Sequence, residues 1–116
     1  MHKNNQLTEL ITELRKTSAI QQAPVWSAVA DDLARPTRQK AIVNLAKLAR
    51  STKQGEVIIV PGKVLGDGEL SHSLTIAALG FSASAQLKLK ANKTIMITIT
   101  DALKKDPKGK SVRILA

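Results

Sequence analysis

The sequence contains no cysteine and no tyrosine, and its aromatic residues are one tryptophan and one phenylalanine. Without cysteine there is no disulfide and no thiolate ligand, which excludes disulfide-stapled secreted domains and zinc–thiolate modules. Proteins that read single-stranded nucleic acid stack bases on exposed aromatic rings. Trp26 falls on the apolar side of a predicted helix, so the sequence argues against that mode of binding.

Histidine is also scarce, with His2 near the N-terminus and His72 between two serines. Adjacent side chains rarely reach the geometry of a nucleophile and its base, so a small hydrolase that uses His72 is only a distant alternative to a binding function. One internal histidine without cysteine does not suggest a metal site. We therefore expect no catalytic residue, no metal, no cofactor and no small-molecule substrate.

Long apolar runs are missing as well. No segment approaches the roughly 18–20 apolar residues that cross a bilayer. The first residues, MHKNNQLTEL, lack the apolar stretch and the small-residue cleavage site of a secretory signal. We expect a soluble, cytoplasmic protein that binds no membrane.

Acidic residues are outnumbered, with 9 Asp and Glu against 18 Lys and Arg and a net charge of +9. The excess lies at the two ends: +5 over residues 1–53, zero over 54–103 and +4 over 104–116. From Leu33 to Gly55 there are six basic residues and no acidic one. A solvated cationic surface would explain such a run. A phosphate backbone explains it better, because it relieves the repulsion between these charges and releases its own counterions.

The length of 116 residues predicts one compact domain with one core. Within it we expect a helical N-terminal region with a basic segment over residues 1–40. An α/β core with a basic C-terminal tail is expected over residues 41–116.

Two helices are predicted in the N-terminal region. Apolar residues at positions 7, 10, 11 and 14 have the spacing of one helix face, with Asn5 as the N-cap. The second helix begins with Pro24 and stops before Pro36, so Arg35 leaves the helix. The linker between them, about Ala19–Ala23, is longer than the three or four residues of a DNA-binding helix-turn-helix. We therefore expect folded RNA, bound through phosphate and shape contacts.

Four strand-like apolar runs follow, and their starts are 17, 21 and 17 residues apart. That spacing is too long for tight hairpins and leaves room for a short turn or helix between strands. Ser82 or Ser84 is predicted to cap one such helix, and Thr100 another that Pro107 ends. The alternation in Leu87–Lys90 favours a strand while the serine caps favour a helix, and both remain open. The four runs are Val57–Val60, Leu74–Leu79, Ile95–Ile99 and Val112–Leu115.

Residues 58–70, IIVPGKVLGDGEL, carry three glycines and one proline. They form no nucleotide loop, because Val64 follows Lys63 where a P-loop needs serine or threonine, and the glycine spacing misses the dinucleotide fingerprint. Turns are predicted at Pro61–Gly62 and at Asp67–Gly68. The glycines serve either these turns alone or, in addition, an exposed backbone that faces phosphates beside Lys63.

Several motifs carry a resemblance to a known family. The most specific is VPGKVLGDGEL (Val60–Leu70), accompanied by FSASA (Phe81–Ala85), APVWSAVADDLARPTRQKAIVNLAKLAR (Ala23–Arg50) and LRK (Leu14–Lys16). Over most of its length the chain resembles large-subunit ribosomal protein eighteen-e, of the archaeal and eukaryotic type, a relative of bacterial large-subunit ribosomal protein fifteen. The archaeal form fits better, because the long eukaryotic extensions are missing. The weakest match is Leu87–Lys93, where the family usually has a more acidic helix ending in a glycine pair.

The resemblance implies an α/β fold, an irregular superhelix of strand–strand–helix turns preceded by a helical N-terminal region. It also implies a non-enzymatic structural constituent of the large ribosomal subunit, which binds ribosomal RNA and contacts neighbouring ribosomal proteins. An RNA-binding module or RNA chaperone outside the ribosome is the alternative. The residues expected to contact RNA are Arg35, Arg38, Gln39, Lys40, Arg50, Lys53, Gly62 and Lys63.

Overall fold

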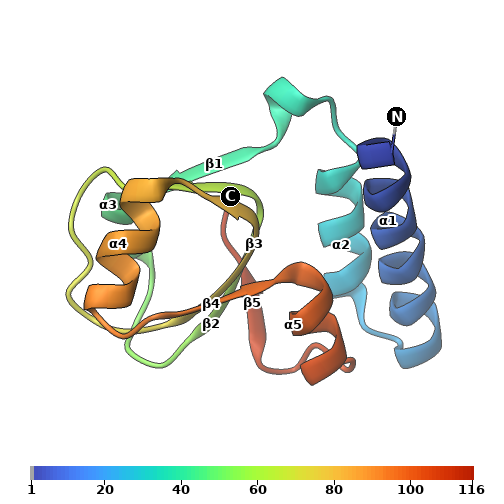
Figure 1. Ribbon diagram of the computed structural model, residues 1–116. Helices are drawn as coiled ribbons and strands as arrows, with labels where there is room; N and C mark the ends of the chain where they lie inside the picture. The colour runs from blue at the N-terminus through green and yellow to red at the C-terminus, as the bar shows by residue number, and fades with distance from the viewer. Residues whose placement is uncertain (1) are drawn as a thin grey trace.

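Two helices open the chain in the computed structural model, which describes residues 2–116. α1 (His2–Gln21) and α2 (Pro24–Leu33) lie antiparallel and side by side at one end of the molecule (Figure 1). Pro24 stands in the first turn of α2 and Arg35 lies beyond its end, as predicted. α1 starts before Asn5, so the predicted N-cap role of Asn5 is wrong. None of the helices in the described part of the chain has the length and apolar character that a bilayer span requires.

The linker between α1 and α2 consists of Gln22 and Ala23 and is therefore shorter than predicted. Gln22 has a φ of 53°, a left-handed conformation that lets the chain reverse in so few residues. The product is a helical hairpin, whereas a helix-turn-helix crosses its two helices at about 90–120°. A DNA-binding helix-turn-helix is thus excluded by the helix arrangement, and the long linker predicted from the sequence was wrong.

The rest of the chain builds a sheet in which each strand pair is parallel. Its strands lie in the order β1 (Ala41–Asn44), β2 (Val57–Leu65), β3 (Thr75–Phe81) and β4 (Ile95–Thr98), while β5 (Val112–Ile114) pairs with β2. A short 3₁₀ turn, η1 (Thr37–Gln39), leads into β1. Parallel pairing requires long connections, and three of these hold α3 (Leu45–Ser51), α4 (Ala83–Ala91) and α5 (Ile99–Lys105). The predicted α/β fold with a helical N-terminal region is confirmed.

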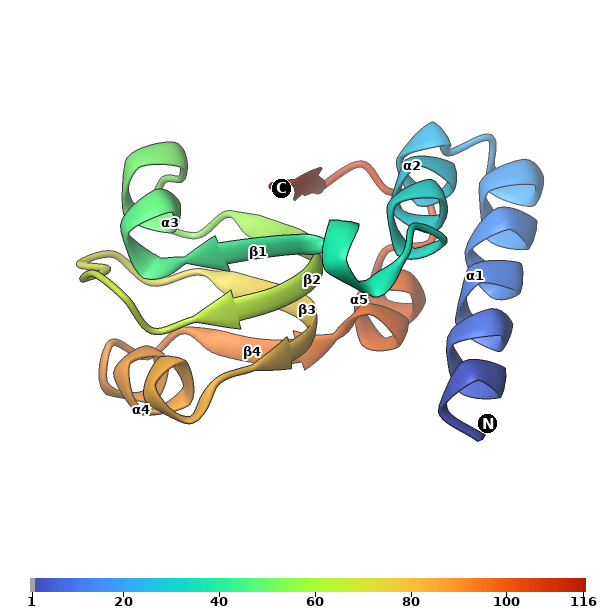
Figure 2. The same cartoon turned by 90° about the horizontal axis from the view of Figure 1, so that it is seen from above.

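β2 has two partners along the same edge. Its first half pairs with β5, Val57 opposite Val112, and its second half pairs with β1, Gly62 opposite Ala41. The pairing with β3 shifts register between Val60 and Lys63, where β2 holds one extra residue. β2 curves strongly, as Figure 2 shows. The strand therefore runs through Pro61–Gly62, and the turn predicted there is wrong.

The core expected from the chain length is divided into two clusters, one on each face of the sheet. Ile58 packs with side chains of α3 and α4, while its neighbour Ile59 packs with α2 and α5, because successive residues of a strand point to opposite faces. Trp26 of α2 is fully buried in the second cluster, and its Nε1 donates a hydrogen bond to the Pro107 carbonyl at 2.8 Å. This tryptophan has no surface on which a base could stack. α2 and the sheet share this second cluster. The division of the chain into two regions at residue 40 stays a prediction.

The structure decides the elements that the sequence left open. Leu87–Lys90 is helical, in α4, whose N-cap Ser82 accepts a hydrogen bond from the Ala85 N–H at 3.2 Å. The cap of α5 is Thr98, which accepts from the Asp101 N–H at 3.0 Å, so the prediction of Thr100 was two residues late. No element had been predicted for β1 and α3.

We predict that Gly62→Ala destabilises the fold. A Cβ on Gly62 would lie 1.9 Å from the Ala41 carbonyl oxygen, which is backbone and cannot move without separating β1 from β2. We expect a loss of at least about 2 kcal/mol in the free energy of unfolding, measured by urea denaturation. Gly80→Ala is the matched control in the neighbouring strand, because no atom lies within 4 Å of its added Cβ. Equal stability of the two variants would contradict the close approach of β1 and β2.

Candidate nucleic-acid interface

The basic segment between α2 and β1 is shaped by hydrogen bonds to its own backbone. The Gln39 N–H donates to the Pro36 carbonyl at 2.8 Å, and the Lys40 Nζ donates to the Arg35 carbonyl at 3.0 Å. The Arg35 guanidinium lies 3.7 Å from the Asp32 carboxylate, one turn earlier. Arg38, in η1, is exposed and pairs with no carboxylate in the described part of the chain. Its charge is therefore available to an external anion.

The pairing of β1 with β2 brings this segment to Lys63. Ile42 lies directly opposite Lys63, which is exposed and has no carboxylate partner among residues 2–116. Gly62 is buried, and the Ala41 backbone fills the space beside it, so this glycine is needed for strand pairing. A contact of Gly62 with RNA stays a prediction. A hollow of about 400 Å³, here called the β1–β3 hollow, is lined by Lys40, Ala41, Ile42, Gly62, Lys63, Leu79 and Gly80.

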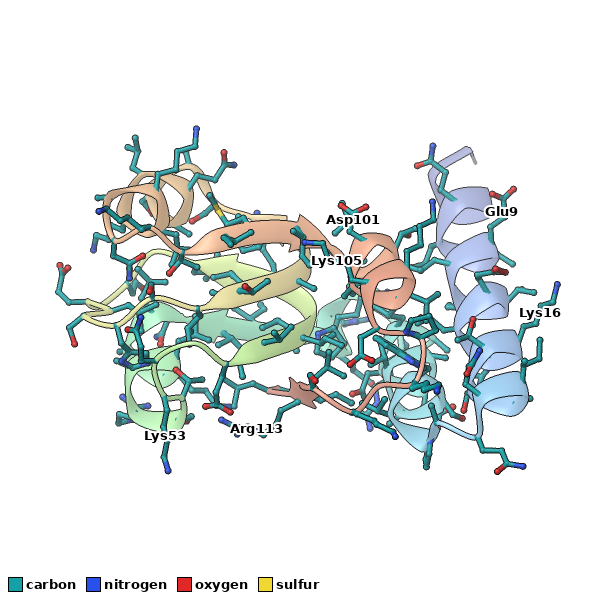
Figure 3. The ribbon with its side chains drawn as sticks, turned by 90° about the horizontal axis from the view of Figure 1, so that it is seen from below. Glu9, Lys16, Lys53, Asp101, Lys105 and Arg113 are labelled. Atoms are coloured by element: carbon teal, nitrogen blue, oxygen red, sulfur yellow. The ribbon has the colours of Figure 1, made fainter. Side chains whose placement is uncertain are left out.

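Arg50 and Lys53 belong to a second basic group. They line a hollow of about 340 Å³ together with Arg113 of β5, and Figure 3 shows Lys53 and Arg113 on the same side of the molecule. β1 and α3 separate this group from the η1 segment, spanning about 13 Å and about 10 Å along their axes. The eight predicted residues therefore form two basic groups and not one. Their contact with RNA stays a prediction.

The second group contains a bidentate ion pair. Arg113 donates two hydrogen bonds to the Glu56 carboxylate, both at 3.0 Å, and a third to the Ser51 carbonyl at 2.6 Å. The two bonds from Arg113 to the carboxylate, joined by one from the Lys53 N–H at 2.7 Å, hold the pKa of Glu56 below its ordinary value of 4.5. The same contact raises the pKa of Arg113. Arg113 thus fixes the C-terminal strand to the end of α3.

Sequence reasoning missed the C-terminal cations. Arg113 was not among the predicted site residues, and neither was Lys47, whose Nζ donates to the Ala116 carbonyl. Lys108 and Lys110 line a further hollow beside the start of α2. The charge of +4 over residues 104–116 was the signal, but it did not show which of these residues meet the rest of the chain.

The glycine-rich loop after β2 is held from inside the protein. Gly68 has a φ of +93°, which confirms the predicted turn at Asp67–Gly68. The Lys88 Nζ donates to the Gly66 and Gly68 carbonyls at 2.9 and 3.0 Å, and the Asn92 Nδ2 donates to two further carbonyls of the loop that follows. Both donors lie in Leu87–Lys93, the segment with the weakest resemblance to the family. That segment therefore has a structural role in this chain.

His72 is tied to Thr52, and the contact does not create a nucleophile. The Thr52 hydroxyl donates its one proton to the Leu48 carbonyl at 2.6 Å, so at 2.7 Å the His72 Nε2 must donate to the Thr52 oxygen. A base that activates a hydroxyl has to accept its proton. In residues 2–116, no three side chains of metal-ligating type come together. The hydrolase hypothesis gains nothing from this geometry.

The chain matches one family of known proteins. The family model, which describes the ribosomal proteins 50S-L15 and 50S-L18e together with a 60S counterpart, aligns with residues 5–93. The chain belongs to this ribosomal protein family. The resemblance seen in its glycine-rich and basic motifs is thereby confirmed.

Archaeal relatives match over almost the whole length. The large ribosomal subunit protein eL18 of Methanoregula boonei is 49% identical over 112 residues, covering 97% of this chain and 93% of the relative. The proteins of the same name from Methanococcus maripaludis and Archaeoglobus fulgidus are 40% and 41% identical, each over 116 residues. These alignments cover 100% and 99% of this chain and 97% and 99% of the two relatives. The family membership therefore extends to the C-terminal residues, which contain Arg113.

We predict that Glu56→Gln lowers the unfolding midpoint at pH 7, because it removes the ionised partner of Arg113. A carboxyl group whose pKa is lowered by folding stabilises the fold above its unfolded pKa, near 4.5, and loses that effect as the pH falls through the folded value. The difference between the variant and the parent protein should therefore shrink as the pH is lowered below 4.5. Glu69→Gln is the control, since its carboxylate is 87% exposed and 3.5 Å from Lys88. A deficit of Glu56→Gln that stays the same as the pH is lowered through the acidic range would contradict this account.

Proposed function

We propose that this protein is a structural, non-enzymatic component of the large ribosomal subunit that binds folded ribosomal RNA. The observation that carries the proposal is the near-full-length match to relatives named as large-subunit proteins, at 40–49% identity. The basic groups on the surface supply a physical basis for RNA as the partner. Neighbouring ribosomal proteins are the other expected contacts.

Charge neutralisation is the proposed mode of binding. Arg38, Lys53 and Lys63 are exposed, and none forms a salt bridge with a carboxylate of the described residues. Each phosphate that such a side chain contacts releases condensed counterions, which makes the affinity strongly dependent on salt. Both aromatic side chains are at least partly buried, so the contacts are to backbone and shape and not to stacked single-stranded bases along a strand. Arg35, Gln39, Lys40, Arg50 and Gly62 complete the proposed interface.

Sedimentation tests the ribosomal role. In a sucrose gradient of the native cell lysate, we expect the protein to migrate with large subunits in one-to-one amount and to stay there after a high-salt wash. An integral constituent is held by many contacts at the same time, and a high-salt wash does not break all of them at once. A substoichiometric or salt-labile signal would instead favour an RNA-binding module or chaperone outside the ribosome.

Salt dependence tests the phosphate contacts. We expect Arg38→Ala/Lys63→Ala to make the negative slope of log affinity against log salt concentration shallower by roughly 1.4–1.8 for a large-subunit ribosomal RNA transcript. Lys16→Ala/Lys90→Ala is the matched control with the same net charge: both lysines are exposed, and Lys16 points away from the sheet (Figure 3). Equal slopes for the two double variants would show that Arg38 and Lys63 contact no phosphate and are only solvated by water.

A further inference from the structure

The floor of the β1–β3 hollow exposes apolar side chains that belong to neither core cluster. Ile42 is 66% exposed and Leu79 is 44% exposed, although both stand in strands of the sheet. Their neighbours Val43 and Ala78 point to the other face and are buried there. Both side chains would bury further apolar surface if a partner covered the hollow, which would stabilise the complex.

Strand pairing places a cation between these apolar groups. Ile42 of β1 lies opposite Lys63 of β2, and Lys63 lies opposite Gly80 of β3, directly after Leu79. With strands about 4.8 Å apart, Ile42 and Gly80 are separated by about 10 Å with Lys63 between them. No atom lies within 4 Å of the position that a Cβ on Gly80 would occupy. A flat group can therefore approach the backbone of β3 in the hollow.

The positive charge of the hollow favours a ligand in which the flat group is linked to an anion. Its two ionisable residues are Lys40 and Lys63, and no acidic residue lines it. The Lys40 Nζ already donates to the Arg35 carbonyl, whereas the Lys63 ammonium group donates no hydrogen bond to the described residues. An apolar peptide would fill the floor and leave this ammonium group without an anion. A nucleotide satisfies both features, because its base is a flat group of modest polarity and its phosphate is an anion.

We propose that the β1–β3 hollow receives one unpaired base turned out of the folded ribosomal RNA, with the base against Ile42 and Leu79 and an adjoining phosphate at Lys63. The inference rests on the proposed function and adds a contact of a different physical kind. Phosphate contacts position the RNA without distinguishing its sequence. The hollow accepts RNA only where a nucleotide is free of its helix, so it selects a bulge or a loop and fixes the register of the protein on it.

Affinity measurements separate this contact from the ionic ones. We expect Ile42→Ser/Leu79→Ser to weaken binding to the large-subunit ribosomal RNA transcript by about tenfold at each salt concentration, with an unchanged salt slope. Both side chains are exposed, so the unfolding midpoint should stay that of the parent protein. Leu87→Ser/Ile95→Ser is the matched control, because these residues are 72% and 55% exposed on α4 and β4, outside the hollow. Equal affinity of the two variants would overturn the inference.

Chemical probing locates the base. Dimethyl sulfate and a carbodiimide together report on the pairing edges of all four bases. With the RNA saturated by either protein, we expect one or two unpaired nucleotides to be protected by the parent protein and reactive with Ile42→Ser/Leu79→Ser. Identical patterns for the two proteins would overturn the inference.

The outcomes also distinguish this inference from the proposed function. If the parent protein binds the transcript no better than an unrelated RNA, the proposed function fails and the inference fails with it. If the parent protein and the hollow variant bind alike, only the inference fails. A hollow variant that binds RNA normally but is lost from sedimenting large subunits would show that a neighbouring protein covers the hollow, which also overturns it.

Discussion

The close approach of β1 to the second half of β2 is the contact on which the rest of the structure depends. It is possible because position 62 has no side chain, so the Ala41 carbonyl can occupy the space that a Cβ would take. The extra residue between Val60 and Lys63 bends β2 at the same place and allows it to pair with β5 before the bend and with β1 after it. One strand thereby holds together β1 and β5, which lie far apart in the sequence. The curvature also turns Lys63 toward the basic segment that precedes β1.

The few acidic residues act as structural ties. Glu56 binds Arg113 and so attaches β5 to the segment before β2, while Asp31 binds Arg15 at 2.9 Å and joins α2 to α1. Because these acidic residues are used in a few local ion pairs, most Lys and Arg side chains have no acidic partner within the described residues. A net charge of +9 on 116 residues opposes the compact state by self-repulsion. Part of that charge lies in the two basic groups on the protein surface, where a polyanion can neutralise it.

Several predictions that depend on neighbours along the chain hold, although the N-caps predicted at Asn5 and Thr100 were misplaced. Pro24 at a helix start and Ser82 as an N-cap depend on backbone groups within three or four residues, and both predictions hold. Pro61–Gly62 has the composition of a turn, yet it forms a bulge because β1 and β3 pair on either side of it. β1 has only four residues, and its partner strand lies about twenty residues later in the sequence. The residues next to β1 therefore gave no signal that predicts a strand there. Arg113 was missed for the same reason, since Glu56 is 57 residues away.

By itself the sequence determined the surplus of positive charge, the positions of the apolar runs, a spacing between them that is too long for tight hairpins, and the family to which the chain belongs. These follow from composition, from periodicity and from motifs, which are properties of single residues or of neighbours along the chain. Only the tertiary structure decided that Gly62 accommodates a strand, that the basic residues divide into two groups, and that Ile42 and Leu79 flank Lys63 in one hollow. Those relations depend on strand register and on the bend in β2, which arise from contacts between residues that are distant in the sequence.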